Sequence, residues 1–413
     1  MTVYAGPRRR TGKGRGPEGS GLYPELAAFR ISEGCSPNVQ AETGRLVGLL
    51  PIATAQAELS RHGLDLDEKA VHRIASELGL QMLATRTRDV LRYRQGELPA
   101  GTELAGKRVA VQIDGGRIRI RTVVKKSRVG KKTKRRKFRV EWREPKVLVI
   151  HEFDEKGRMV RGSRPVIDGT LRGPDALIEL VAFHLHRLGA AQAQEVVFVA
   201  DGAAWIWNRI GWVVQKVGLA RERVFEVLDW CHAVHHVSVA LEDLKLDKAQ
   251  RSALYVRLRK ALIRGKANEV IAELERLARA RRRDQPVWRE IRYLRKHAKA
   301  DRMRYPIFRY RRLPIGSGAV ESTIRRIINL RLKGNAIYWK ADNAEAIFQL
   351  RAAELSGRLN EAIDHTRDSI ARNRRLDWHW QPPADLLELK TLDDLDDEKT
   401  EPNSVQQPTR RAA

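Results

Sequence analysis

Three acidic residues stand at positions where a sequence can build a metal site. Asp114 and Asp201 each follow a run of mainly apolar, strand-forming residues, and Glu321 follows a Gly-Ser-Gly segment. Carboxylate oxygens are the ligands that Mg²⁺ and Mn²⁺ prefer. Two such ions can activate an attacking oxygen and stabilise a leaving oxygen in phosphoryl transfer. We therefore predict that Asp114, Asp201 and Glu321 are catalytic residues that hold two Mg²⁺ or Mn²⁺ ions.

Each of these acids also has an ordinary structural explanation. Asp-Gly is a common turn, and a glutamate in the first turn of a helix interacts favourably with the helix dipole. The combination is more specific, because both aspartates end apolar runs and Glu321 opens a helical pattern behind a glycine loop. Strand ends on neighbouring strands meet at one edge of a sheet, where α/β folds place their sites.

The segments that carry these acids predict a mixed sheet flanked by helices. Period-two alternation and continuous apolar runs indicate strands, and one-sided apolar spacing indicates helices. We expect an antiparallel meander of strands at 108–113, 118–120, 139–142 and 146–152, a helix at 175–188, a buried strand at 195–200 parallel to its neighbour, and helices at 320–332 and 341–370. From Asp201 to about Arg304 the pattern is helical, with no strand expected. This order resembles the ribonuclease H-like fold.

Composition shifts divide the chain into segments. Residues 52–80 have the pattern of a helix-turn-helix, although an ordinary helical hairpin has the same signature. The predicted organisation is a flexible basic arm at 1–21, a helical DNA-binding domain at 22–105, the α/β core at 106–217, an all-α insertion at 218–312, C-terminal core helices at 313–375, and a disordered acidic tail at 376–413.

The composition indicates an intracellular protein with a polyanionic partner. The formal net charge is +28, which favours nucleic acid because the basic residues recur along most of the chain. Cys35 and Cys231 are the two cysteines, too few for a disulfide framework or a four-cysteine zinc site. No run approaches the roughly 20 apolar residues that span a bilayer. We expect a cytoplasmic, nucleoid-associated protein with no membrane partner.

Several basic segments are candidates for DNA contact. Arg276–Arg312 mixes 15 basic residues with aromatic residues that either stack on unpaired bases or fill a core. Arg325 and Asn329 lie four and eight positions after Glu321, on the same helical face. Trp205 and Trp207 are interpreted as packing residues, with a role as base wedges as the alternative. The densest segment, for which a solvated loop is the alternative, supplies the predicted phosphate contacts Lys125, Lys126, Arg128, Lys131, Lys132, Lys134, Arg135, Arg136 and Lys137.

Four segments together carry a resemblance to a known family. They are Val111–Arg117, Trp142–Val147, Phe198–Ile206 and Pro314–Ser322, and they resemble bacterial insertion-sequence transposases of the ISKra type, which are related to Mutator-like transposases. The resemblance covers roughly residues 50–360. It implies an RNase H-like catalytic core with Asp114, Asp201 and Glu321 as the catalytic acids. The 120-position interval from Asp201 to Glu321 (321 − 201) resembles members with a helical insertion before the last acid.

The segment Leu228–His236 resembles the Asp/Cys-x-x-His signature of the same family. Asp229 and His232 occupy the matching positions, which implies a catalytic role for His232 near the scissile phosphate and a DNA-side role for Asp229. A buried structural histidine is the alternative for His232. A metal site formed by His232 with Cys231, His235 and His236 lacks an evident, well-spaced fourth partner.

These observations predict a transposase that uses Mg²⁺ or Mn²⁺ to cleave DNA and to join strands. Its partners would be double-stranded DNA, at element ends and at the target, and further copies of the chain in a homodimer or higher assembly. Two alternatives remain open: an RNase H-like nuclease without strand transfer, such as a resolvase or a domesticated transposase, and a non-catalytic DNA-binding regulator. Terminal inverted repeats around the coding sequence would favour transposition.

Overall fold

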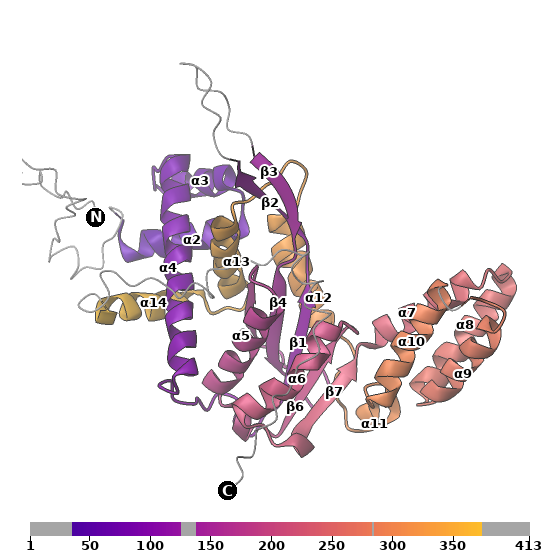
Figure 1. Ribbon diagram of the computed structural model, residues 1–413. Helices are drawn as coiled ribbons and strands as arrows, with labels where there is room; N and C mark the ends of the chain where they lie inside the picture. The colour runs from indigo at the N-terminus through magenta and orange to yellow at the C-terminus, as the bar shows by residue number, and fades with distance from the viewer. Residues whose placement is uncertain (1–34, 125–137, 283–284, 374–413) are drawn as a thin grey trace, which may run out of the picture.

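The computed structural model describes residues 35–124, 138–282 and 285–373, and its centre is a mixed five-stranded sheet (Figure 1). The strand order is β5-β4-β1-β6-β7, in which β1, β6 and β7 are parallel and β4 is antiparallel to both of its neighbours. This confirms the predicted α/β class and the parallel strand at 195–200. The strands are β1 Arg108–Gly115, β4 Lys146–Glu152, β5 Val166–Thr170, β6 Glu195–Ala200 and β7 Val224–Leu228.

The predicted meander is wrong, because β1 pairs with β4 and a separate two-stranded sheet projects from this pair. That sheet consists of β2 Ile118–Val123 and β3 Phe138–Arg143. The chain bends between the two sheets at Gly115 and Gly116, opposite Pro145, where the Gly116 N–H donates to the Pro145 carbonyl at 3.0 Å. Glycine and proline weaken a continuous ladder. The result is one long hairpin with a break, so β2 extends beyond the end of β1.

Strand β7 is a second correction. We expected helix throughout this region and an all-α insertion from residue 218, but Val224–Leu228 pairs in parallel with β6. Its sequence, Val-Phe-Glu-Val-Leu, is short and interrupted by Glu226, so its apolar run is weaker than that of β6. The all-helical part therefore begins after β7. It contains α7 Trp230–Asp243, α8 Lys248–Ile263, α9 Ala267–Ala278, α10 Pro286–Lys299 and α11 Tyr305–Tyr310.

Helices cover both faces of the sheet. On one face lie α5 Pro174–Arg187 and α6 Ala204–Val217, which bury Val111 and Phe198. The other face is divided: α7 and the helices after it pack on Val197 and Val199, while N-terminal and C-terminal helices pack on Val147 and Val149. Helices α8–α11 extend to one side of the sheet (Figure 1). Two short 3₁₀ turns, Ala190–Gln192 and Arg221–Arg223, precede β6 and β7.

The N-terminal helices share their core with the sheet. They are α2 Pro37–Leu49, α3 Ile52–Arg61 and α4 Glu68–Arg94, and Asp67 caps α4 by accepting from the Ala70 N–H at 2.6 Å. Leu46 and Val71 belong to the same hydrophobic cluster as Val147. The turn predicted between residues 62 and 67 is present, and α4 continues well past residue 80. Whether this segment binds DNA stays a prediction.

The C-terminal core helices are α12 Gly318–Ile324, α13 Ala341–Leu355 and α14 Leu359–Asn373. α12 continues without interruption as the π-helix η3 Arg325–Leu332. Along 321–332, exposed pairs and buried pairs alternate with a repeat of four residues. A straight α-helix repeats every 3.6 residues. The wider turn of a π-helix allows residues four positions apart to lie along one face.

Three of the predicted segments cannot be compared with the structure, whereas the prediction about membrane spans can be compared with the described helices. The basic arm at 1–21, the basic segment at 125–137 and the acidic tail at 376–413 lie outside the described residues. Among the helices that are described, none has the length and apolar character needed to cross a membrane.

Candidate metal centre

Three aspartates lie at equivalent positions on three adjacent parallel strands. In the sheet Ile113 pairs with Ala200, and Ala200 pairs with Leu228. Asp114, Asp201 and Asp229 each come directly after one of these three residues. Neighbouring strands lie about 4.8 Å apart, and residues in register share one face of the sheet. The three side chains therefore lie next to one another along the carboxyl edge, on the face that α7 and α12 cover. Asp114 and Asp201 are adjacent there, as their sequence positions led us to expect.

Glu321 reaches this edge from the first turn of α12. The loop before α12 and the first turn of α12 are held by the buried side chain of Gln112, three residues before the end of β1. Its Oε1 accepts from the Val320 N–H at 3.0 Å, and its Nε2 donates to the Gly316 carbonyl at 3.3 Å. Both hydrogen-bonding ends of the amide are thus used on one loop. Gln112, which we had not assigned a role, sets the position from which Glu321 projects.

Asp229 holds the same loop from the other side. Its Oδ2 accepts from the Ser317 N–H at 2.5 Å and from the Ser317 Oγ at 2.8 Å. Its Oδ1 caps α7 by accepting from the His232 N–H at 2.8 Å. The Ser317 Oγ also lies 3.2 Å from a Glu321 carboxylate oxygen. Asp229 therefore couples the start of α7 to the start of α12.

Asp229 is buried, and the DNA-side role that the family signature implies for it stays a prediction. Its exposed fraction is 1%, and both carboxylate oxygens already accept hydrogen bonds from inside the protein. Burial alone would raise the pKa of Asp229, but the hydrogen bonds from His232 and Ser317 outweigh it and lower the pKa to about 2. Asp229 is a charged positioning residue.

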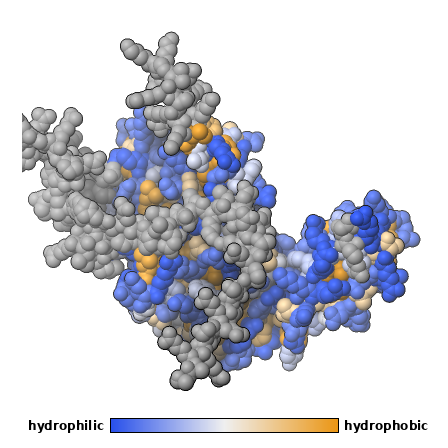
Figure 2. Space-filling view, viewed as in Figure 1, coloured by the Kyte–Doolittle hydropathy of each residue, from blue (hydrophilic) through white to orange (hydrophobic). Residues whose placement is uncertain are grey.

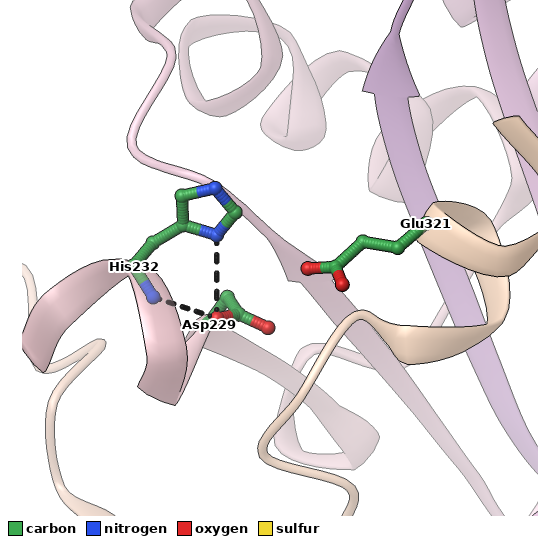
Figure 3. Close-up of side chains that lie close together, drawn as sticks. All are labelled: Asp229, His232 and Glu321. Atoms are coloured by element: carbon green, nitrogen blue, oxygen red, sulfur yellow. Dashed lines mark hydrogen bonds and ion pairs between the residues drawn. The ribbon is translucent and has the colours of Figure 1, made fainter. Parts of the chain in front are cut away.

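His232 and Glu321 point into the space between α7 and α12 (Figure 3). The His232 Nδ1 lies 3.3 Å from the Asp229 Oδ1, within ion-pair range but without good hydrogen-bond geometry. This contact with Asp229 outweighs partial burial and raises the pKa of His232. The imidazole is only partly buried, so it can face a bound phosphate while Asp229 favours its protonated form.

The negative charges at this edge are poorly compensated. Burial, together with the nearby charges of Asp201 and Glu321, outweighs the opposing effects of the Gly115 N–H and His232 and raises the pKa of Asp114 to about 6. In the described part of the chain, none of the three predicted acids forms a salt bridge. Clustered carboxylates without cationic partners are stabilised by a bound cation, and an oxygen-rich set suits Mg²⁺ or Mn²⁺.

The side chains of the predicted ligands do not converge on a single point. The described residues whose ligand atoms lie within 4.8 Å of one another are Asp229, His232 and Glu321, and Asp114 and Asp201 are outside this group. Asp114 Oδ1 accepts from Gly115 at 2.6 Å, and Asp201 Oδ1 accepts from Ala203 at 3.0 Å. Each aspartate therefore keeps its second oxygen for a ligand.

Tyr293 of α10, one of the aromatic residues in the basic block 276–312, also borders this edge. Its ring packs on the backbone of Gly202, where a Cβ atom would lie 2.0 Å from a ring carbon. Only glycine fits beneath this ring. Burial and the charge of Asp201 raise the pKa of the Tyr293 hydroxyl well above its usual range. Tyr293 thus connects the helical insertion to the residue next to Asp201.

The histidines after His232 have other roles. His236 pairs through Nδ1 with Glu290 and stacks on Tyr293, with ring centroids 3.5 Å apart. Cys231 and His235 are exposed. Within the described residues these side chains do not form a metal-ligand group with His232, so the structure does not support that alternative.

The predicted DNA-contact residues fall into three groups. Lys125–Lys137 lies outside the described residues. Arg325 and Asn329 are exposed on η3, on the same four-residue repeat as Glu321. In the basic block 276–312, the aromatic residues Trp288, Tyr305 and Phe308 are buried, whereas Tyr310 is 87% exposed.

The tryptophans after Asp201 are packing residues, as predicted. The Trp207 indole N–H donates to the Asp201 carbonyl at 2.6 Å, and the side chain is buried. The Trp205 ring lies 4.5 Å from the Lys146 Nζ, which pairs with Glu144. Both rings therefore stabilise the start of α6 rather than face a ligand.

The chain was compared with protein-family models, with curated proteins and with solved structures, and none of the three comparisons found a match.

Proposed function

We propose that this protein is a metal-dependent DNA transposase of the Asp-Asp-Glu type with an RNase H-like core. The observation that carries the proposal is the alignment of Asp114 and Asp201 at adjacent strand ends, with Glu321 held beside them by Gln112 and Asp229. The mixed sheet, the helical segment between β7 and α12, and the net charge of +28 are consistent with it.

Asp114, Asp201 and Glu321 would hold two Mg²⁺ or Mn²⁺ ions, which when bound supply activation of the attacking oxygen and stabilisation of the leaving oxygen. The protein's own residues do the positioning. Gln112 and Ser317 fix the loop from which Glu321 projects, and His232 faces the phosphate with a proton that Asp229 favours. Water would attack in cleavage, and a DNA 3′-hydroxyl in joining.

The test is a reaction with labelled duplexes that carry the DNA flanking the coding sequence. Purified protein with Mg²⁺ or Mn²⁺ should give 3′-hydroxyl cuts and joined products. Asp201→Asn and Glu321→Gln should abolish both while DNA binding persists. Glu155→Gln changes an exposed carboxylate away from the edge and should react as wild type. Normal cutting by Asp201→Asn would contradict the proposal.

The same reaction separates the two alternatives. Cutting that never yields joined products would indicate a nuclease without strand transfer. Binding without any metal-dependent cutting, unchanged by Asp201→Asn, would indicate a regulator. Terminal inverted repeats in the flanking DNA provide an independent criterion for transposition.

A further inference from the structure

The β2–β3 hairpin has an outer face that the proposed site does not use. Its cross-strand pairs are Arg119 with Trp142, Arg121 with Val140, and Val123 with Phe138. Directly paired residues lie on one face of a sheet. The alternating residues Ile118 and Ile120 are buried, so they fix the opposite face against the core. We call the six paired residues the hairpin outer face.

This face exposes an unusual amount of apolar surface. Phe138 and Trp142 are each 48% exposed, and Val123 and Val140 are 46% and 39% exposed. Tyr338 lies beside them, with its ring centroid 6.1 Å from that of Phe138. Figure 2 shows apolar surface over this hairpin. Single exposed apolar residues are normal, whereas a contiguous group of them marks an interaction site.

The charges on the face are all positive. Arg119 lies 4.7 Å from the ring centroid of Tyr338 and 5.7 Å from that of Trp142, and Arg121 lies 5.9 Å from that of Phe138. Neither arginine forms a salt bridge with a residue that the structure describes. The nearest acid in the hairpin, Glu141, lies on the opposite face and pairs with Arg143.

Arg119 also donates to the Gly334 carbonyl, which leaves the positive charge of both arginines without an acidic partner among the described residues. Flat rings beside such arginines fit a polyanion that also presents π-faces. Nucleic acid has both properties, and unpaired bases expose the faces that a duplex hides. A second copy of this chain fits less well, because pairing two such faces would bring Arg119 and Arg121 against their own counterparts. The chemistry therefore favours single-stranded nucleotides over a dimer contact.

The hairpin begins at the proposed catalytic edge. β2 starts three residues after Gly115, the last residue of β1, and Asp114 is that strand's penultimate residue. Six residues of strand extend about 20 Å, enough to follow a few nucleotides. The register of the β1–β4 ladder continues into β2–β3, so Asp114 shares the side of Ile118 and Ile120, and a DNA strand that leaves Asp114 would reach the hairpin outer face around the edge of the hairpin.

We propose that the hairpin outer face binds unpaired nucleotides of a DNA end, with Trp142 and Phe138 stacking on bases and Arg119 and Arg121 near the phosphates. This rests on the proposed function for its DNA partner. It adds that the protein separates the strands near the cut and holds one of them on this face.

The test compares a blunt duplex with the same duplex carrying a single-stranded tail, by fluorescence anisotropy with EDTA present so that no cutting occurs. Trp142→Ala and Phe138→Ala should each weaken binding of the tailed DNA about tenfold and change blunt-duplex binding by less than about twofold. Trp142→Phe should retain most of the affinity, because it keeps a ring. Trp212→Ala removes a 46% exposed tryptophan on α6 and should have no effect.

Three results would overturn the inference: tailed-DNA affinity unaffected by either alanine variant, equal losses on blunt and tailed DNA, or loss of self-association by Trp142→Ala with DNA affinity intact. Its failure is distinguishable from failure of the proposed function. Wild-type protein that binds tailed DNA through Trp142 but never cuts would remove the transposase proposal alone. Thermal unfolding of each variant is the control for folding: the substitutions at Trp142 and Phe138 should leave the unfolding temperature close to that of wild type.

Discussion

Asp114, Asp201 and Asp229 occupy equivalent strand ends, yet their hydrogen bonds give them different roles. Asp229 uses both oxygens inside the protein and is 1% exposed, whereas each of the others has one oxygen bonded to a nearby backbone N–H. A carboxylate that accepts several N–H and O–H bonds is held as an anion and is costly to redirect. Asp114 and Asp201 therefore suit ligation, and Asp229 suits positioning.

Asp229→Asn tests this division. An asparagine can accept at only one of its two terminal atoms, so either Ser317 or His232 loses its acceptor. We expect cleavage to fall about 100-fold and the free energy of unfolding to fall by about 1–3 kcal/mol, the cost of an unsatisfied buried donor. Asp247→Asn alters an exposed helix cap with comparable bonds and should retain full cleavage. Equal cleavage by both variants would argue against a positioning role.

Asp168 offers a separate test by pH. The buried carboxylate of β5 accepts from Arg86 at 2.5 Å, Gln349 at 2.6 Å and His184 at 2.8 Å. Burial would raise its pKa, but Arg86, His184 and Gln349 outweigh it and hold the pKa well below the usual range. A lowered pKa contributes stability above about pH 4, the unfolded value, which is lost as the pH falls towards the folded value.

We therefore expect Asp168→Asn to lower the free energy of unfolding by about 3–5 kcal/mol at pH 7, because it leaves Arg86 buried without its charge partner. The difference from wild type should shrink below about pH 3. Urea denaturation at several pH values measures it. Asp364→Asn, at a 65% exposed side chain, should show no comparable loss at any pH.

At the scale of elements, loop placement depends on contacts between distant segments. The Ile315–Val320 segment is held by Gln112 from β1, by Asp229 after β7, and by the Trp230 N–H, which donates to the Ile315 carbonyl at 2.8 Å. Elsewhere, Arg351 of α13 donates to the Gly48 and Leu49 carbonyls at the end of α2. Such bonds replace the caps that the helix ends lack.

Arg351→Leu should show what this capping contributes. It removes the donor for Gly48 and Leu49, and for the Arg326 carbonyl at 2.7 Å, so we expect a loss of about 2–3 kcal/mol in unfolding free energy. A lower urea midpoint with an unchanged slope would be the signature. Arg309→Leu, at an exposed position of α11, serves as the control. An unchanged midpoint would mean that water satisfies these carbonyls.

The strongest local patterns were predictable from the sequence. The apolar runs before Asp114 and Asp201 gave both strands, and their ends gave the shared edge. Strand β7 was missed because Glu226 interrupts a five-residue run. In retrospect, the apolar run that ends in Asp229 repeats the form of the other two and could have revealed it. The hairpin pairing was missed because alternation identifies a strand but not its partner.

The support around the acids could not be predicted. Gln112 lies within a strand pattern, and its loop partner Val320 is 208 positions away. Tyr293 reaches Gly202 from a helix whose aromatic residues mostly fill its own core. Such contacts depend on tertiary packing, which a single sequence does not encode in local spacing.

At the scale of the whole molecule, the chain closes on itself around the sheet. Arg367 of α14 donates to the Pro37 carbonyl of α2 at 2.7 Å, and the N-terminal helices share one hydrophobic cluster with η3 and α13. The α8–α11 helices lie to the opposite side, and the carboxyl edge with the aspartates lies between these two parts (Figure 1). Both parts can therefore flank a substrate held at that edge.

The net formal charge of +28 predicts how DNA binding responds to salt. Each phosphate neutralised by a basic side chain releases counterions, so contacts with about 6–10 phosphates would weaken binding by about 10³–10⁵ between 50 and 200 mM salt. Anisotropy of Asp201→Asn on a blunt duplex measures this slope without cutting. Base stacking releases no counterions. A single-stranded tail should therefore raise the affinity without increasing the salt dependence that each contacted phosphate contributes. A response that is nearly flat on both DNAs would mean that phosphate contacts are few, despite the charge.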